Sequence, residues 1–97
     1  MAKGYWVSLY RSVSNPAALA EYAKEAGPVI EAGGGRFLAR GAAVKAYEAG
    51  VIERSVLIEF DSVEKAIATY ESAPYQSAMK HLKGACVRDV RFLEGAQ

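Results

Sequence analysis

The sequence has little cysteine and little histidine, and this scarcity excludes two ways of building a small domain. Its single cysteine, Cys86, cannot form an intrachain disulfide, so no disulfide bridge holds the fold together. One cysteine and one histidine are also too few for the ligand set of a structural zinc site. We therefore expect a domain that is stabilised by its own hydrophobic core and that uses no metal and no other cofactor.

An excess of charge of one sign is missing as well. Twelve lysines and arginines stand against eleven aspartates and glutamates, which gives a net charge of +1. Proteins that neutralise nucleic-acid phosphates need a clustered excess of basic side chains, and here no basic run is longer than two residues. We therefore expect no nucleic acid among the partners of this protein.

Long apolar runs are absent too. No stretch approaches the about 20 apolar residues that span a bilayer, and the first residues show no signal-peptide pattern. We expect a cytoplasmic protein that does not enter the membrane. What the sequence does have is a hydrophobic fraction of 52%, which is ample for one packed core, so residues 1–97 are expected to form a single domain.

Four segments rich in β-branched and aromatic side chains predict strands, and the apolar spacing between them predicts helices. The expected strands are 4–13, 36–40 together with 44–47 and a bend or bulge around Gly41, 55–60 and 87–93. The expected helices are 16–32, interrupted at Pro28, and 63–71, followed by a further helical turn or two over 75–82. Asn15 and Ser62 are suited to cap the two helices.

This order, β-α-β-β-α-β, predicts an α+β protein with the ferredoxin-like fold, a four-stranded antiparallel sheet with the helices on one face. The other face must be hidden in another way, because the first strand carries large apolar side chains on both sides. Tyr5 and Val7 point one way, and Trp6 and Tyr10 point the other. Pairing of two sheets in a homodimer is the simplest solution, since twofold dimers are the commonest oligomers.

Three stretches in this order, 34–41 (GGRFLARG), 58–62 (IEFDS) and 72–76 (SAPYQ), resemble the uncharacterised family called domain of unknown function 1330. The resemblance extends over nearly the whole chain, from Gly4 to Gly95. It implies a dimeric α+β barrel, in which two ferredoxin-like protomers join their sheets. The family supplies no established activity. Its wider superfamily includes cofactor-free monooxygenases, isomerases similar to muconolactone isomerase, haem-degrading enzymes and ligand-binding regulatory domains.

Arg36, Arg40 and Glu59 form the sharpest candidate site. The even spacing of the two arginines would place them on one face of the second strand, and Glu59 interrupts the apolar pattern of the strand expected beside it. One interpretation is a pocket in which the arginines bind a substrate carboxylate or enolate and Glu59 accepts a proton. The other, which we favour, is a structural ion pair that fixes the hairpin or a dimer interface.

Tyr22, Tyr70 and Tyr75 lie at or near the inward positions of the expected helices. They could line an apolar cleft and offer their hydroxyls to a ligand. Tyrosines at such positions are more often part of the core, with only the hydroxyl in contact with water. The sequence leaves both interpretations open and favours the second.

His81, the only histidine, is a further candidate for a catalytic group, because histidine is the residue type most often used as a general acid or base near neutral pH. It could act as a general base or as the axial ligand of a haem, as in the haem-degrading branch of the superfamily. That branch carries an asparagine on the first strand and a tryptophan on the second helix. Here the first strand has no asparagine and itself carries the only tryptophan, Trp6. Haem degradation is therefore disfavoured, and an exposed histidine without a role is the simpler interpretation.

The sequence does not decide whether the protein is an enzyme. Our first hypothesis is a small homodimer that binds, and could transform, a small organic acid or aromatic metabolite without a cofactor, in a cleft near Arg36, Arg40, Glu59 and Tyr75. The alternatives are a non-catalytic ligand-binding or interaction module, and a cofactor-free monooxygenase or isomerase. A pocket beside Glu59 would favour the enzyme, and closed ion pairs without a cavity would count against it.

Overall fold

The computed structural model describes residues 2–96. Within that range the elements follow the expected order: β1 (Gly4–Val13), α1 (Pro16–Ala32), β2 (Arg36–Ala42), β3 (Arg54–Phe60), α2 (Val63–Glu71), α3 (Ala73–Met79), the 3-10 turn η1 (Lys80–Leu82) and β4 (Cys86–Glu94). α2, α3 and η1 together take the place of the second helix in the β-α-β-β-α-β pattern.

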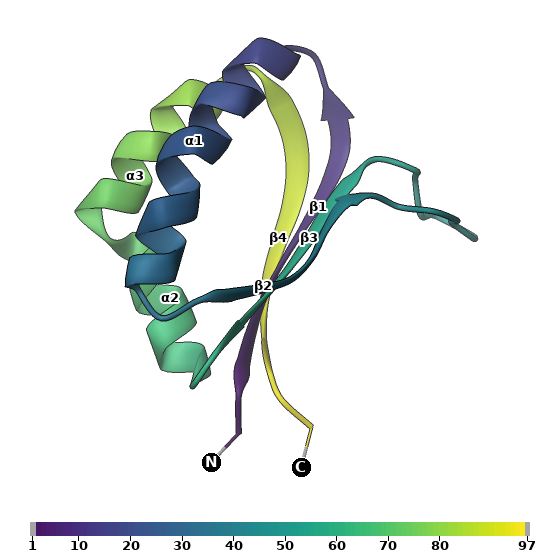
Figure 1. The fold of residues 1–97 in the computed structure, drawn as a ribbon. Coiled ribbons are helices and arrows are strands. Elements are labelled where there is room, and N and C mark those ends of the chain that lie inside the picture. The colour runs from purple at the N-terminus through teal and green to yellow at the C-terminus, as the bar shows by residue number, and fades with distance from the viewer. Residues whose placement is uncertain (1, 97) are drawn as a thin grey trace.

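The strands form one antiparallel sheet in the order β2-β3-β1-β4. The helices cover one face of this sheet and leave the other uncovered, as Figure 1 shows. We call the helix-covered face the inner face and the opposite one the outer face. This arrangement is the ferredoxin-like α+β fold, so the predicted fold class is confirmed. The pairing of two such sheets in a dimeric barrel stays a prediction.

The helix boundaries follow the capping residues that the sequence offers. The side chains of Asn15 and Ser62 accept hydrogen bonds from backbone amides in the first turns of α1 and α2. Contrary to the expected interruption, α1 continues as one helix past Pro28. Just beyond its end Gly34 has a φ of 97°, a conformation that glycine adopts without strain and that turns the chain into β2.

The second strand is shorter than expected. β2 ends at Ala42, so 44–47 is not part of it. Residues 43–53 form an arm between β2 and β3 instead, and Figure 1 shows this arm projecting on the side away from the helices. A backbone hydrogen bond of 2.9 Å from Gly50 to Tyr47 closes the turn within the arm.

The irregularity within β2 lies at Leu38 and not around Gly41. Phe37 is paired with β3 and so is Ala39, but Leu38 between them has no partner in the register. Leu38 is therefore the extra residue of a β-bulge. Because side chains alternate between faces along a strand, one extra residue reverses the face on which every later side chain of β2 lies.

The core lies between the inner face and the helices. Its largest fully buried side chains are Trp6, Ile58, Phe60 and Tyr75. The Trp6 ring contacts the Tyr75 ring edge-on, with 4.9 Å between ring centroids. The alternation expected for β1 is confirmed, because Trp6 is buried on the inner face whereas Leu9, on the outer face, is 39% exposed. The outer face therefore keeps apolar side chains in contact with water.

Candidate functional site

The cleft that was expected to bring Arg36, Arg40, Glu59 and Tyr75 together does not form. The Leu38 bulge turns Arg40 to the inner face, while Arg36 remains opposite Glu59 on the outer face. Tyr75 is fully buried on the inner side. The prediction that the two arginines share one face is therefore wrong, and they belong to two separate groups of polar side chains.

A cavity lies between α1 and the inner face. It contains about 360 Å³ of space not filled by atoms, its open mouth included. Its inner part has room for about two ordered water molecules. The polar side chains that line it are Ser8, Tyr10, Tyr22, Arg40, Arg54 and Arg88, and apolar side chains form the rest of its wall. Tyr22 and Arg40 are thus the two expected ligand-binding residues that reach this cavity.

Within residues 2–96, the three arginines of this cavity have no carboxylate partner. No ion pair within residues 2–96 involves Arg40, Arg54 or Arg88, and no aspartate or glutamate lines the cavity. The Nε atom of Arg54 is buried and has no hydrogen-bond partner in the described part of the chain. The Arg40 guanidinium lies over the Phe37 ring, 4.4 Å from its centroid. Three cations without a counter-charge make this cavity a place for negative charge.

Arg88, which lines the cavity, lies at the centre of a hydrogen-bonded cluster. Its Nη1 atom donates to the hydroxyls of Tyr10 (3.4 Å) and Tyr22 (3.3 Å). Its Nη2 atom donates to the Tyr75 hydroxyl and to the Met79 sulfur, both at 2.9 Å. The Tyr22 and Tyr75 hydroxyls are hydrogen-bonded to each other. One guanidinium therefore holds three tyrosine hydroxyls in place.

Burial favours the protonated form of Tyr75 and Tyr10 in this cluster. It raises the pKa of Tyr75 far above its ordinary value, and it raises the pKa of Tyr10 against the opposing effect of Arg88. Both phenols are therefore protonated near neutral pH. Burial alone would lower the pKa of Arg88, but the surrounding tyrosine oxygens outweigh it and raise that pKa, so Arg88 keeps its charge.

Tyr70, the remaining tyrosine expected at a ligand site, lies outside the lining of this cavity. Its ring packs edge-on against Trp6 (5.5 Å between centroids) and Phe92 (5.7 Å), and it lies at 5.1 Å from the Tyr75 ring. Tyr70 is therefore placed among the aromatic side chains of the core. Tyr75 does not line the cavity either, but its hydroxyl supports that of Tyr22 from behind.

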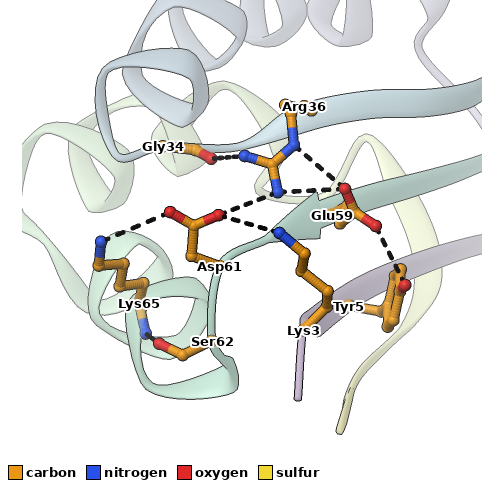
Figure 2. Close-up of polar contacts among 8 residues, drawn as sticks. All are labelled: Lys3, Tyr5, Gly34, Arg36, Glu59, Asp61, Ser62 and Lys65. Carbon is orange, nitrogen blue, oxygen red and sulfur yellow. Dashed lines mark hydrogen bonds and ion pairs between the residues drawn. The ribbon is translucent and has the colours of Figure 1, made fainter. Parts of the chain in front are cut away.

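On the outer face, Arg36 and Glu59 form a closed pair, which Figure 2 shows. The Nε and Nη2 atoms of Arg36 both lie 3.1 Å from Glu59 Oε1, and the Tyr5 hydroxyl donates to Oε2 at 3.1 Å. The hydrogen bond from Tyr5, followed by that from Arg36, lowers the pKa of Glu59. A carboxylate with both oxygens engaged and a lowered pKa is a weak proton acceptor.

The same network extends to the start of α2 in Figure 2. Arg36 Nη2 lies 3.3 Å from Asp61 Oδ1, Lys3 Nζ lies 3.4 Å from the same atom, and Lys65 Nζ lies 3.8 Å from Oδ2. The hydrogen bond from Lys3 is the largest cause of the lowered pKa of Asp61. Neither Arg36 nor Glu59 lines the inner cavity. This geometry matches the structural interpretation of the pair, and a catalytic role of Glu59 stays a prediction.

His81 lies away from the inner cavity. It follows α3 in η1, and its Nε2 atom is hydrogen-bonded to Glu25 of α1 at the surface. Neither residue lines the cavity. A catalytic role of His81 therefore stays a prediction. Burial raises the pKa of the Cys86 thiol, which disfavours its reactive thiolate form.

Four polar residues of the cavity, Ser8, Tyr10, Arg54 and Arg88, were not singled out from the sequence. A signal for the two arginines was present in the alternation of the strands. Arg88 falls on the same face of β4 as Phe92, and Arg54 on the same face of β3 as Ile58, so each places a charge at an inward position. A cation at an inward strand position is the pattern that would have indicated this site.

Within residues 2–96, no group of three or more His, Cys, Asp or Glu side chains is placed to hold a metal ion. None of the helices described here combines the length and the apolar character needed to cross a membrane.

Comparison with known proteins gives a family and a fold. Residues 3–96 match the family described as Domain of unknown function (DUF1330). None of the curated proteins matches the sequence. Solved structures that are similar include RPA0582, a protein of unknown function from Rhodopseudomonas palustris, which is 20% identical with a TM-score of 0.75 over 99% of this chain and 84% of that one.

Two further structures have names that bear on function or assembly. SnoaB, a cofactor-independent oxygenase from Streptomyces nogalater, is 10% identical, with a TM-score of 0.68 over 100% of this chain and 96% of its own. A dimeric ferredoxin-like protein of unknown function from Thermobifida fusca is 13% identical, with a TM-score of 0.55 over 96% of this chain and 91% of its own. At such identities the similarity establishes the ferredoxin-like fold alone.

Proposed function

This chain belongs to the DUF1330 family, whose function is unassigned, and from its own site we propose that it binds a small organic anion in the cavity between α1 and the sheet. The observation that carries this proposal is the set of three guanidinium groups, Arg40, Arg54 and Arg88, with no carboxylate among the lining residues. Arginine pairs with carboxylates through two parallel hydrogen bonds, which gives both affinity and orientation.

The two arginines that bind the anion are Arg40 and Arg54. Arg88 already donates to three tyrosine hydroxyls, whereas the Arg54 Nε atom has no partner within residues 2–96. Arg40 is exposed and can reorient when a ligand enters, which a narrow cavity requires. The apolar wall, which includes Phe37, suits the ring of an aromatic acid. The ligand class is therefore a small aromatic or otherwise planar carboxylate.

A cofactor-free oxygenation or isomerisation is the second candidate function. It is favoured by the fold shared with SnoaB, a cofactor-independent oxygenase, and by a cavity that would stabilise a substrate enolate. Against it, the cavity residues include no Asp, Glu or His that could remove a proton. Binding is therefore the activity that we propose first, and turnover would require a substrate that is already ionised in the cavity.

Titration calorimetry with benzoate tests the binding proposal. Benzamide has the same shape without the charge and should bind at least about tenfold more weakly, because it cannot form the charged pair. Arg54→Gln should lower the affinity for benzoate by a similar factor. Arg36→Gln, which removes a paired arginine from the outer face, is the matched control and should leave it unchanged. Equal binding of benzoate by wild type and Arg54→Gln, or no binding of any small carboxylate, would overturn the proposal.

We also infer that the outer face pairs with a second copy of the chain. Leu9 (39% exposed) and Leu93 (53%) lie on that face, and the arm carries Val44 (101%) and Tyr47 (73%). Exposed apolar side chains gathered on one side of a small protein are typical of an interface, and the similar fold from Thermobifida fusca is described as dimeric. These observations support a homodimer formed sheet to sheet.

Sedimentation velocity tests this assembly. The wild-type protein should sediment as a dimer, and Leu9→Glu combined with Leu93→Glu should sediment as a monomer, because two charges per protomer would be buried in the interface. Ile67→Glu, which places a charge at an exposed apolar position of α2, is the control and should remain dimeric. A monomeric wild-type protein would contradict the inference.

A further inference from the structure

The hydroxyl of Tyr75 can donate its proton in one direction only. This side chain is fully buried, and in the described chain its hydroxyl contacts only Tyr22 and Arg88. A guanidinium has donors and no acceptor, so Arg88 cannot receive the proton. Tyr75 therefore donates to the Tyr22 oxygen.

The proton of Tyr22 is then left for the cavity. The Tyr22 oxygen receives one hydrogen bond from Tyr75 and another from Arg88 Nη1. No acceptor for its own proton is found within residues 2–96, and Tyr22 lines the cavity. The same holds for Tyr10, whose oxygen accepts from the same Nη1 atom at 3.4 Å and which also lines the cavity. Both hydroxyls are thus held close to one nitrogen atom, and each has a proton to donate.

Ser8 of β1 is a third hydroxyl that accepts a hydrogen bond and keeps a proton to donate. Its Oγ accepts a hydrogen bond of 3.0 Å from Trp6 Nε1, and in the described part of the chain it has no acceptor for its own proton. Ser8 is only 3% exposed and lines the cavity. The polar lining of the cavity therefore consists of hydroxyls that each already accept a hydrogen bond and still have a proton to donate, together with guanidinium groups, which have donors and no acceptor.

From these hydrogen bonds we propose that the cavity contains a second subsite. In it the hydroxyls of Tyr10, Tyr22 and Ser8 donate to a single anionic oxygen of the ligand. The proposal rests on the proposed function, because the carboxylate of the same ligand would lie against Arg40 and Arg54. The ligand is then an acid that carries a phenolate or enolate oxygen in addition to its carboxylate. Arg88 is the positioning residue, since it fixes the direction in which the hydroxyls donate.

Physical chemistry favours a phenolate or enolate over a second carboxylate at this subsite. A carboxylate is best matched by the two parallel donors of a guanidinium, whereas single hydroxyls from different elements suit one oxygen atom that accepts several hydrogen bonds. Contact with the charged Arg88 polarises the Tyr22 and Tyr10 hydroxyls, which strengthens their donation. Donors aimed at a charged oxygen in a cavity with little water stabilise it strongly.

Spectrophotometric titration of bound 4-hydroxy-3-nitrobenzoate tests this subsite. Its nitro group brings the phenol pKa near neutrality and makes the phenolate absorb visible light, so the ionisation of the bound ligand can be followed directly. In the complex the phenol pKa should fall, which corresponds to a preference for the phenolate of at least about tenfold. Tyr22→Phe and Tyr10→Phe, which remove one hydroxyl each, should bring the phenol pKa of the bound ligand much of the way back to that of the free ligand.

Two further measurements distinguish an effect on the subsite from an effect on the arginines or on folding. 3-Nitrobenzoate lacks the phenol, so Tyr22→Phe and Tyr10→Phe should lower its affinity less than they lower the affinity for the phenolate of 4-hydroxy-3-nitrobenzoate, and its retained binding shows that these variants are folded. Arg88→Lys keeps the charge but not the several directed donors, and it should reduce the pKa shift of the bound phenol as the tyrosine variants do.

The outcomes distinguish this proposal from the one on which it rests. If both nitrobenzoates bind through Arg54 but the bound phenol titrates as the free one does, the subsite is overturned and the carboxylate site survives. If the phenol pKa falls equally in wild type, Tyr22→Phe and Tyr10→Phe, the arginines alone explain the shift and the subsite is again overturned. If neither compound binds, both proposals fail.

Discussion

Arginine side chains lie on both faces of this sheet, and the two groups differ in what surrounds them. On the outer face, Arg36 lies between the carboxylates of Glu59 and Asp61, and every charge in that network has an opposite charge beside it. On the inner side, Arg54 and Arg88 face a cavity whose lining contains no acid. The outer group is neutralised within the protein, whereas the inner group needs hydroxyls, water or a ligand to satisfy it. Absence of a counter-charge, more than the number of arginines, therefore indicates the ligand site in this molecule.

The largest difference between the two groups should be seen in stability. Arg88→Ala removes the group that satisfies the buried hydroxyls of Tyr22 and Tyr75, and we expect it to lower the free energy of unfolding by about 2–4 kcal/mol. Arg36→Ala, in the solvated network, should cost much less because water can replace the lost pair. Urea unfolding followed by the fluorescence of the single Trp6 measures both. Equal losses for the two variants would mean that the inner cluster is as well hydrated as the outer one.

A carboxylate introduced into the cavity should pair with the inner arginines, as Glu59 and Asp61 pair with Arg36 on the outer face. Ala23 of α1 lines the cavity and is half-buried, so Ala23→Glu can reach the unpaired arginines while glutamate still suits a helix. We expect the affinity for benzoate to fall by at least about tenfold, because the new side chain competes for the same guanidinium groups. Calorimetry of Ala23→Gln, which adds the same bulk without charge, is the control. If the two variants weaken binding equally, the effect is one of space and not of charge.

The fold was predictable because its signals are local. Asn15 and Ser62 cap helices where such residues usually do, and apolar alternation located β1 and β3 nearly to the residue. Pro28 was expected to interrupt α1, but the helix continues through it because packing of its buried face against the sheet outweighs one lost hydrogen bond. Local preference thus described the elements well and failed where tertiary packing was stronger.

The site was less predictable because it depends on a single irregularity. Without the bulge at Leu38, strict alternation would have placed Arg40 beside Arg36, as the sequence suggested. Nothing in the residue types around Leu38 marks the extra residue, so the face of Arg40 could not be derived from spacing. Arg88 was missed for a different reason, since its inward position was visible in β4 but its tyrosine partners come from distant elements.

Acid should weaken the ion pairs of the outer network, whereas within residues 2–96 the inner cluster contains no carboxylate that acid could protonate. The pKa of Glu59 lies below its usual 4.5 and that of Asp61 below its usual 3.8, so near these pH values the unfolded chain binds more protons than the folded one. The stability that the network contributes is thus present at neutral pH and is lost as the pH falls through the lowered folded-state pKa values. In Glu59→Gln the loss of stability between neutral pH and pH about 3 should be smaller than in wild type.

Urea unfolding at the two pH values measures this difference. Glu71→Gln is the control, because Glu71 is exposed and forms no ion pair within residues 2–96. An acid-induced loss as large in Glu59→Gln as in wild type would show that the pair with Arg36 does not contribute to folding.

The smallest effect is expected at His81, which lies apart from both groups of arginines. His81→Ala removes a surface contact with Glu25 that joins η1 to α1. Exposed pairs of this kind contribute little, so the free energy of unfolding should change by less than about 1 kcal/mol. The affinity for benzoate should be unchanged, because His81 does not line the cavity. A clear loss of benzoate affinity without a loss of stability would mean that the ligand extends beyond the inner cavity toward η1. His81 would then contribute to ligand binding.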